Sequence, residues 1–340
     1  MVRDHPDGGG RELLTRTRPA PPSTDADFEG TATSRGSSYA SARPGPLAVS
    51  GRFVPPGGHR YAAEAGPVRC VRCDFSGNGS KNNPGYTLAA TYLVQTTFEA
   101  VDSVWHDNWT NTDAAGLHGW KAEVTLLRPR FEANTTAGGG AALYSTGSTV
   151  EVTDGVFEDN EATAQGSGAV GAKIHATSPG VLMFTRTRFT GNRSATGPGA
   201  FTAEAGVALD LDDVRWEGNT GKTAGAAHLL LGADDIVWGD LVFVGNTSSG
   251  KAGALRVDAS DDVALPDLTA HGNSAATNCG AAVWVTALGT GERVVFEDGA
   301  WGSASTDNTP GDVLYGNECV PLRLPGTDTV TCTPSGCTGP

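Results

Sequence analysis

A short pattern, an aromatic residue followed by two variable residues and then Asn, returns at a nearly fixed interval along this sequence and limits the folds that it can adopt. Clear copies occupy 75–78, 105–108, 131–134, 157–160, 189–192, 216–219 and 243–246. A last copy at 270–273 keeps Asn273 but has Ala270 in place of the aromatic. Successive Asn residues are 30, 26, 26, 32, 27, 27 and 27 positions apart. A fixed period of roughly 20–50 residues indicates a solenoid, in which each unit stacks on its neighbours.

The residues between the copies favour strands over helices. Gly totals 47, and good helix formers are too sparse for stacked amphipathic helices. Short alternating runs at 148–153 and 207–211 have the two-residue period of a strand. The units lack the fixed leucines of leucine-rich repeats and are shorter than propeller blades of about 40 residues. We therefore predict an all-β chain, a parallel β-helix of about 9–10 coils of roughly 27 residues each.

This geometry assigns a place to each repeated residue. The aromatic residue should fill the interior of its coil. The Asn should lie at a corner, where its side chain can bond the backbone and a neighbouring Asn, and where left-handed conformations are tolerated. Six to eight residues after each Asn, a Gly enters a small or apolar run and should supply the opposite tight bend. Examples are Gly140, Gly168, Gly199, Gly253 and Gly280.

Together these two signals resemble the polymorphic outer membrane protein repeat family, whose hallmarks are Phe-x-x-Asn and a Gly-Gly-Ala-Ile-like segment. The resemblance covers roughly residues 70–310, and Gly139-Gly140-Ala141 is the full triplet. It implies a right-handed parallel β-helix, similar to pectin-lyase-like proteins, in a surface-displayed adhesin or passenger domain. Association with an outer membrane is implied by the resemblance alone.

Four regions are expected along the chain. Residues 1–24 are rich in Pro, Arg, Gly and Asp, and are predicted to be a disordered leader. Residues 25–69 keep a degenerate pattern and are predicted to be N-terminal capping coils, because terminal repeats must cover an open strand edge. The regular β-helix is expected over 70–310. A Cys-rich C-terminal cap or tail is expected over 311–340.

The charge, hydropathy and cysteine content of the chain indicate which classes of partner and which cellular locations to expect. A net charge of −14 leaves no basic stripe for phosphates, so no nucleic-acid partner is expected. No apolar run approaches the roughly 18 residues of a transmembrane helix, and no signal peptide is visible near the N-terminus. The cysteines are Cys70, Cys73, Cys279, Cys319, Cys332 and Cys337. An even set in a secreted chain indicates disulfides that staple the ends, with free thiols or a zinc half-site at Cys70 and Cys73 as alternatives. We expect an extracellular or cell-surface location.

Counting six residues back from each repeat Asn gives a file of charged residues. Its members are Arg72, Asp102, Arg128, Asp154, Arg186, Asp213, Asp240 and Asp267. On the strand of an inward aromatic this position should point outward, so stacked neighbours of alternating sign attract and fix the register. Asp213, Asp240 and Asp267 break the alternation. They should repel unless solvent, Arg215 or a hard cation relieves them, which makes them a candidate Ca²⁺ site.

No catalytic residues are predicted. A galacturonase-like site would need paired carboxyls about 5–10 Å apart, but Asn111-Thr112-Asp113 and Asp212-Asp213 should lie about four coils apart. The seven His show no metal or triad spacing. We predict a non-enzymatic surface or extracellular module without a cofactor, adhesin-like or for structural display, that binds a protein or glycan of a cell surface along one long face. The alternatives are a pectin-lyase-like polysaccharide lyase or glycoside hydrolase, and a purely structural spacer.

Overall fold

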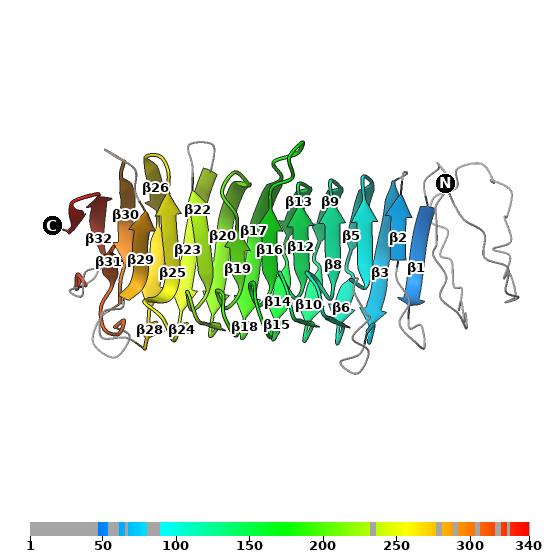
Figure 1. Ribbon diagram of the computed structural model, residues 1–340, viewed down its shortest axis with the longest axis horizontal. Coiled ribbons are helices and arrows are strands. Elements are labelled where there is room, and N and C mark those ends of the chain that lie inside the picture. The colour runs from blue at the N-terminus through cyan, green and yellow to red at the C-terminus, as the bar shows by residue number, and fades with distance from the viewer. Residues whose placement is uncertain are drawn as a thin grey trace, which may run out of the picture.

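The fold is a parallel β-solenoid of about 8 turns, with equivalent strands about 27 residues apart (Figure 1). The computed structural model describes residues 47–53, 61–64, 67–79, 89–231, 236–276, 281–287, 292–302, 307–316, 321–324 and 327–339. These residues form three sheets and no helix. The predicted fold class is therefore confirmed. The leader predicted over 1–24 lies outside the described residues.

The sheets are named here by the number of their described strands. The sixteen-stranded sheet contains β1 (Leu47–Phe53), β3 (Val68–Ser76), β5 (Thr97–Val101), β6 (Val104–His106), β9 (Glu123–Leu127), β10 (Arg130–Glu132), β13 (Thr149–Thr153), β14 (Val156–Glu158), β17 (Val181–Thr190), β20 (Ala208–Glu217), β23 (Ile236–Val244), β26 (Val263–Pro266), β27 (Leu268–His271), β30 (Val294–Ala300), β32 (Thr327–Thr333) and β33 (Gly336–Thr338). The ten-stranded sheet contains β2 (Tyr61–Glu64), β4 (Thr91–Val94), β8 (Leu117–Trp120), β12 (Leu143–Thr146), β16 (Val170–Lys173), β19 (Phe201–Ala203), β22 (Ala227–Leu231), β25 (Ala252–Ala259), β29 (Ala281–Ala287) and β31 (Val313–Tyr315). The seven-stranded sheet contains β7 (Trp109–Thr110), β11 (Thr135–Thr136), β15 (Glu161–Ala162), β18 (Arg193–Ser194), β21 (Thr220–Gly221), β24 (Thr247–Ser248) and β28 (Ser274–Ala275).

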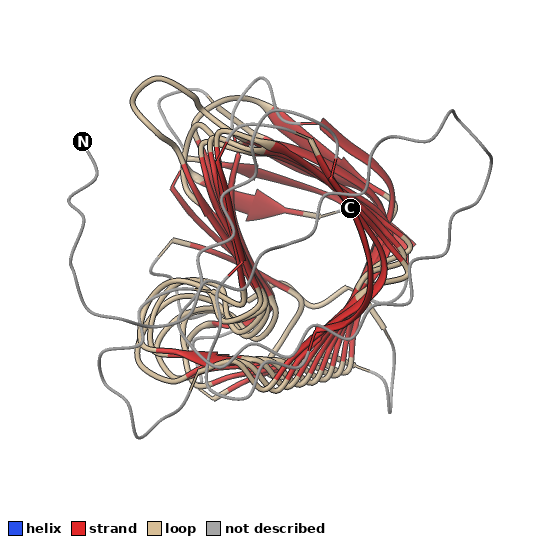
Figure 2. Cartoon of the chain, turned by 90° about the vertical axis from the view of Figure 1, so that its right-hand side faces the viewer, coloured by secondary structure: helices blue, strands red, loops and turns tan. Residues whose placement is uncertain are grey.

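One turn of the solenoid passes through all three sheets. In the turn made by β9, β10, β11 and β12, the first two strands belong to the sixteen-stranded sheet, which bends at the corner between them. β10 pairs in parallel with β6 and with β14 without offset, so Phe131 lies between Trp105 and Phe157. Viewed along the long axis, the strands of successive turns superpose (Figure 2). A periodic sequence therefore becomes files of stacked side chains.

The repeated aromatic residues form one such file inside the solenoid. Its members are Phe75, Trp105, Phe131, Phe157, Phe189, Trp216 and Phe243, all buried. Neighbouring rings stack with centroids 4.6–5.5 Å apart and planes within 19° of each other. Ala270 pairs with Phe243 in the next turn and ends the stack. The predicted inward position of the aromatic residue is confirmed.

The repeated Asn residues form a second buried file, at the corner between the sixteen-stranded and seven-stranded sheets. Its members are Asn78, Asn108, Asn134, Asn160, Asn192, Asn219, Asn246, Asn273 and Asn308. Each Nδ2 donates to the Oδ1 of the next Asn at 2.8–3.1 Å. The predicted Asn-to-Asn and Asn-to-backbone bonds are thus confirmed. The left-handed conformation falls on the residue before the Asn, as at Ala133 and Asp159, both with φ 52°.

Asn308 also belongs to this hydrogen-bonded file of Asn residues, which we call the ladder, although the sequence pattern did not identify it. It follows Asn273 by 35 positions, and no aromatic residue stands three positions before it. Its Nδ2 donates to Oδ1 of the buried Asp312 at 2.8 Å, and Oδ2 of Asp312 accepts the backbone N–H of Leu324 at 2.7 Å. Burial raises the pKa of Asp312 despite these bonds. Asp312 thus closes the C-terminal end of the ladder.

The Gly-rich segments are needed where consecutive turns approach most closely. A Cβ built on Gly225 would lie well inside 3.0 Å of the carbonyl oxygen of Gly253, and one on Gly199 would meet the carbonyl oxygen of Gly225 in the same way. Backbone atoms cannot move aside as a flexible side chain can. The absence of a side chain, rather than a positive φ, is what these positions require.

We expect Gly225→Ala to lower the free energy of unfolding by about 2–3 kcal/mol, because the added methyl group forces adjacent turns apart. The matched control is Gly218→Ala, where φ is +63° and nothing lies within 4 Å of the added Cβ. The control should cost about 1 kcal/mol, through the left-handed backbone alone. Urea denaturation followed by circular dichroism measures both. Equal costs would contradict the close approach at Gly225.

The two ends carry the described disulfides. Cys70 pairs with Cys73 within β3, and Cys332 pairs with Cys337 across the antiparallel strands β32 and β33. The prediction of disulfides is confirmed for these pairs, which lie within one strand and one hairpin and do not join separate turns. Cys279 and Cys319 lie outside the described residues. β32 also pairs with β30 in antiparallel fashion. Within the described part of the chain, no helix is long and apolar enough to span a membrane.

Candidate functional site

The charged file found by counting back from each Asn lies on the surface, at the corner inside the sixteen-stranded sheet. Asp102 lies between β5 and β6, and Asp154 between β13 and β14, whereas the prediction placed this position on the strand of the aromatic residue. The left-handed conformation, with φ from 47° to 55°, is shared by Arg72, Asp102, Arg128, Asp154, Arg186, Asp213 and Asp267. A sharp bend at this position explains why the strands before and after it belong to different faces.

Two pairs of this file are joined by forked hydrogen bonds. Arg128 donates to both carboxylate oxygens of Asp102 at 2.6 and 3.1 Å, and Arg186 to those of Asp154 at 2.7 and 3.3 Å. These hydrogen bonds hold the pKa values of Asp102 and Asp154 below their usual range. The attraction between neighbours of opposite sign is therefore present as predicted. Because these side chains are exposed, the pairs contribute little to the free energy of unfolding. Their main effect is to favour the observed register of the strands over a shifted one.

The candidate calcium residues do not occupy equivalent places. Asp213 and Asp267 lie at the left-handed corner, but in the turn between them Gly239 takes that corner with φ 67°. The pairing of β20 with β23 skips a residue here, so Asp240 is an exposed extra residue beside the file. Among the residues that the structure describes, no group of three or more His, Cys, Asp or Glu is placed to hold a metal ion. The calcium site at Asp213, Asp240 and Asp267 stays a prediction.

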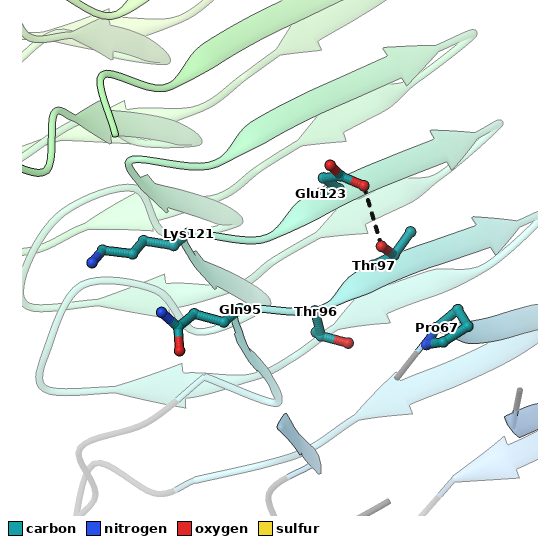
Figure 3. A pocket seen from close by; sticks show the side chains of 6 residues that line it. All are labelled: Pro67, Gln95, Thr96, Thr97, Lys121 and Glu123. Atoms are coloured by element: carbon teal, nitrogen blue, oxygen red, sulfur yellow. Dashed lines mark hydrogen bonds between the residues drawn. The ribbon is translucent and has the colours of Figure 1, made fainter. Parts of the chain in front are cut away.

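A shallow hollow of about 300 Å³ lies at the corner between the ten-stranded and sixteen-stranded sheets (Figure 3). Its lining residues are Pro67, Gln95, Thr96, Thr97, Lys121 and Glu123. The Thr97 hydroxyl donates to Oε2 of Glu123 at 3.2 Å. Gln95 and Lys121 come directly after β4 and β8, have the left-handed conformation and reach outward side by side. The lining can bond hydroxyl groups, but it offers a ligand no aromatic surface.

The outer face of the ten-stranded sheet carries aromatic and ionisable side chains in one file. These residues pair in register from strand to strand, and we call them the outer file: Tyr92, His118, Tyr144, Gly171, Thr202, His228, Arg256, Trp284 and Leu314. Their strand neighbours, such as Leu117 and Leu143, face the interior because side chains alternate along a strand. Aromatic rings with positioned polar groups are the usual lining of binding sites. The outer file is therefore our candidate functional site.

At one end of the outer file, three rings pack edge to face. The His118 ring lies 5.1 Å from Tyr92 and 5.3 Å from Tyr144, with interplanar angles of 88° and 84°. Oγ1 of Thr146 lies 3.3 Å from Nε2 of His118. The Lys173 ammonium lies 5.3 Å from the centroid of the Tyr144 ring. These contacts hold the rings in fixed orientations.

Burial sets the protonation of this end. It lowers the pKa of His118 to about 4, an effect that Asp113 opposes and Lys173 reinforces through their charges. It also raises the pKa of Tyr144, with the negative charges of Asp113 and Glu204 adding to the effect. The imidazole is therefore neutral at physiological pH. Two carboxylates act on this end of the outer file.

The lowered pKa of His118 predicts a pH effect on stability. In the unfolded chain an imidazole titrates near 6.5, so between about pH 6.5 and 4 the unfolded state binds the extra proton. The stability that neutral His118 confers is complete above pH 6.5 and is lost as the pH falls toward 4. Between pH 7 and pH 5 the free energy of unfolding should fall by about 2 kcal/mol less in His118→Phe, which keeps an aromatic ring, than in the unchanged protein. Urea titrations at both pH values measure this difference, and identical pH dependence in the two proteins would contradict it.

The other end of the outer file is a cluster of cations around one indole. Asp258, two residues after Arg256 on β25, accepts from His228 at 2.8 Å and from Arg256 Nη2 at 2.9 Å and Nε at 3.3 Å. Arg256 lies 5.1 Å and the Lys251 ammonium 5.2 Å from the Trp284 ring centroid. Nε1 of Trp284 donates to the carbonyl oxygen of Gly316 at 2.7 Å, which fixes the plane of the ring.

The outer file was not predicted from the sequence. Files were predicted only by their distance from the repeat Asn, and the His residues were interpreted as lacking metal or triad spacing. A usable signal was present in the Gly-rich segments. There a small residue, an inward-facing residue and the residue of the outer file follow one another directly. Examples are Ala142 before Tyr144, Ala226 before His228, Ala254 before Arg256 and Ala282 before Trp284.

No family model, curated protein or solved structure matches this chain. The resemblance to the polymorphic outer membrane protein repeat family therefore stays a prediction. The parallel β-solenoid itself rests on the strand pairing and the stacked files described above.

Proposed function

We propose that this protein is a non-enzymatic, adhesin-like β-solenoid of the cell surface or extracellular space that binds a glycan along the outer file. The observation that supports this most is the alignment of Tyr92, His118, Tyr144, His228, Arg256 and Trp284 on one face of one sheet. With strands about 4.8 Å apart, the seven steps from Tyr92 to Trp284 span roughly 34 Å. A face of this length suits an extended ligand better than a compact one.

The chemistry of this face supports a glycan over a protein partner. Tyr and Trp present apolar rings with a polar edge, and Arg, His and Asp supply directed donors and acceptors for hydroxyl groups. The described part of the chain exposes few large apolar side chains; Ile174 is one, with 44% exposure, whereas protein interfaces bury an apolar core. The two described disulfides support an oxidising compartment outside the cytosol. Membership in the polymorphic outer membrane protein repeat family is part of the same proposal.

The test is to block the middle of the outer file. Thr202 lies between Gly171 and His228, where a large charged side chain would obstruct any ligand that crosses several turns. Thr202→Arg should abolish binding of the full chain to its best ligands on an array of neutral and anionic glycans. The matched control is Thr125→Arg, mid-strand and exposed on the sixteen-stranded sheet, which should bind normally.

Two results would overturn the proposal. One is an equal loss of binding in Thr202→Arg and Thr125→Arg, which would show that the outer file is not the specific binding face. The other is an array without binding combined with strong, Thr202-sensitive binding to deglycosylated surface proteins. That second result would identify a protein partner instead.

One observation favours the alternative of a carbohydrate-active enzyme. His228 and Asp258 form a hydrogen-bonded pair in which both side chains are 16% exposed. Burial raises the pKa of Asp258, but the hydrogen bond and charge of His228 and the charge of Arg256 outweigh it and hold that pKa below its usual range. An ionised carboxylate suits a base or a nucleophile. Release of reducing or unsaturated ends from bound polysaccharide, abolished by Asp258→Asn, would establish this alternative.

A further inference from the structure

We infer that two copies of this protein associate in antiparallel orientation through one face of the sixteen-stranded sheet. This face is formed by β5, β9, β13 and the first parts of β3, β17 and β20, and it ends at the corner that carries the charged file. We call it the dimer face. The inference goes beyond glycan binding, because the outer file lies on the ten-stranded sheet and stays accessible in such a dimer.

The charged file is complementary to its own reverse. From Arg72 to Asp213 the signs of its six members alternate. A two-fold axis parallel to the strands reverses the solenoid axis of the second copy, so each file faces itself with the order of the turns reversed. Asp102 then faces Arg186 of the second copy. Because six alternating charges have the opposite sign at every position when their order is reversed, every such pair attracts.

The ion pairs within each copy do not exclude this contact. Nε and Nη2 of Arg128 and of Arg186 donate to an Asp of their own chain, whereas Nη1 takes no part in these forks. A carboxylate oxygen accepts more than one hydrogen bond, so Asp102 and Asp154 can bind an Arg of each copy. The four side chains are 39–52% exposed. The contact is therefore a network of alternating charges and needs no excess of either sign.

Two further files of outward residues run beside the charged file on the dimer face. In the same antiparallel arrangement no two like charges face each other in their central turns. The facing pairs are Val101 with Thr185, Leu127 with Thr153, Glu99 with Met183, and Thr125 with Glu151. Beyond the corner, by contrast, Glu132 would face Glu158, so the contact ends at the charged file.

The dimer face is large enough for a specific contact. Six strands about 4.8 Å apart, each with about six residues of about 3.3 Å, cover roughly 29 by 20 Å, or about 1,100 Å² from both copies. Specific interfaces begin near about 1,000 Å². The strands of successive turns superpose along the long axis, so the facing files stay in register over the whole length (Figure 2). We expect a weak contact that depends on charge and therefore weakens as salt rises.

Sedimentation of the full chain over a range of concentrations tests this inference. We expect a monomer–dimer equilibrium that shifts toward the monomer as salt rises. Arg186→Glu places a carboxylate opposite Asp102, and Asp102→Lys places an ammonium opposite Arg186. Either change should weaken dimerisation at least about a hundredfold, because the symmetry repeats each like-charged contact. The matched control is Arg193→Glu, exposed on the seven-stranded sheet, which should dimerise normally.

Mixing the two variants separates a lost contact from a damaged fold. In a heterodimer of Arg186→Glu with Asp102→Lys, the two changed residues face each other with opposite signs, and so do the two unchanged ones. The mixture should therefore recover the dimerisation that each variant lacks alone, which a fluorescent label on one variant detects. Thr202→Arg should dimerise normally, so the result is independent of glycan binding.

Three results would overturn the inference. The first is a full chain that stays monomeric at low salt and high micromolar concentration. The second is dimerisation that Arg186→Glu and Asp102→Lys both retain, which would place the contact on another face. The third is a mixture of the two variants that stays monomeric, which would exclude the antiparallel register.

Discussion

Replacing Asn160 with Ala is expected to lower the free energy of unfolding by about 4 kcal/mol or more, the largest effect of any single change considered. The Asn160 amide donates to Oδ1 of Asn192 and to the carbonyl oxygen of Phe131, both at 3.0 Å. Its Oδ1 accepts the backbone N–H and the side-chain amide of Asn134 at 3.1 and 2.9 Å. All four bonds are buried, so truncation leaves donors and acceptors of two adjacent turns without partners or water.

The matched control for this prediction is Glu158→Ala, two residues earlier. Glu158 accepts from Arg130 at 3.3 Å on the surface, where both side chains are more than a third exposed. Its loss should cost no more than about 0.5 kcal/mol, because exposed ion pairs contribute little. Urea denaturation followed by circular dichroism compares the two variants, and hydrogen exchange localises the damage to the turns around Asn160. A cost for Asn160→Ala no larger than that of the control would show that the ladder bonds contribute little.

Replacing Phe157 with Ala is expected to cost about 3–5 kcal/mol, the second of the two large effects. The ring is fully buried and stacks on Phe131 at 4.9 Å and on Phe189 at 4.8 Å. Its removal leaves a cavity between two rings that strand pairing holds in place, so the gap cannot close by collapse. Loss of the ring contacts adds to the lost burial.

Val156→Ala is the comparison for Phe157→Ala, since Val156 is the preceding residue of β14 and faces outward. We expect a cost below about 1 kcal/mol there, because little buried surface is lost. Thermal unfolding of both variants tests the difference. Similar melting temperatures for Phe157→Ala and Val156→Ala would place the aromatic file outside the stabilising core.

The repeat was sufficient to predict the fold because both of its parts have a direct physical cause. An aromatic ring that recurs with the period of the turn must stack on the equivalent ring of the next turn. An Asn that recurs with the same period must hydrogen-bond the equivalent Asn of the next turn. Phe157 and Asn160 were therefore placed correctly from spacing alone. Where insertions break the spacing, the prediction failed. Asn308 was missed because of the longer interval after Asn273. Asp240 was predicted at the corner, but β23 has one extra residue there, so Gly239 occupies the corner instead.

The candidate site could not be predicted in the same way. Residues of the outer file need no common chemistry, because they lie outside the interior of the solenoid and only their inward neighbours must fit its core. His118, Tyr144 and Leu314 are nevertheless buried. Tyr144, Gly171, Thr202 and His228 therefore look unrelated in the sequence, although they pair in register. The contacts of Trp284 with Lys251 and Arg256 depend on side-chain directions that spacing does not determine.

The stacked solenoid requires that residues of consecutive turns lie directly over one another, and cross-linking between turns tests this requirement. Thr125, Glu151 and Met183 pair in register on three consecutive turns. Cysteines at 125 and 151 should therefore be about 4.8 Å apart at Cα, within disulfide range, whereas cysteines at 125 and 183 should be about twice as far apart. After mild oxidation and proteolysis, mass spectrometry should find the 125–151 cross-link and no 125–183 cross-link. The reverse result, or equal yields of both, would contradict the stacked solenoid and every file built on it.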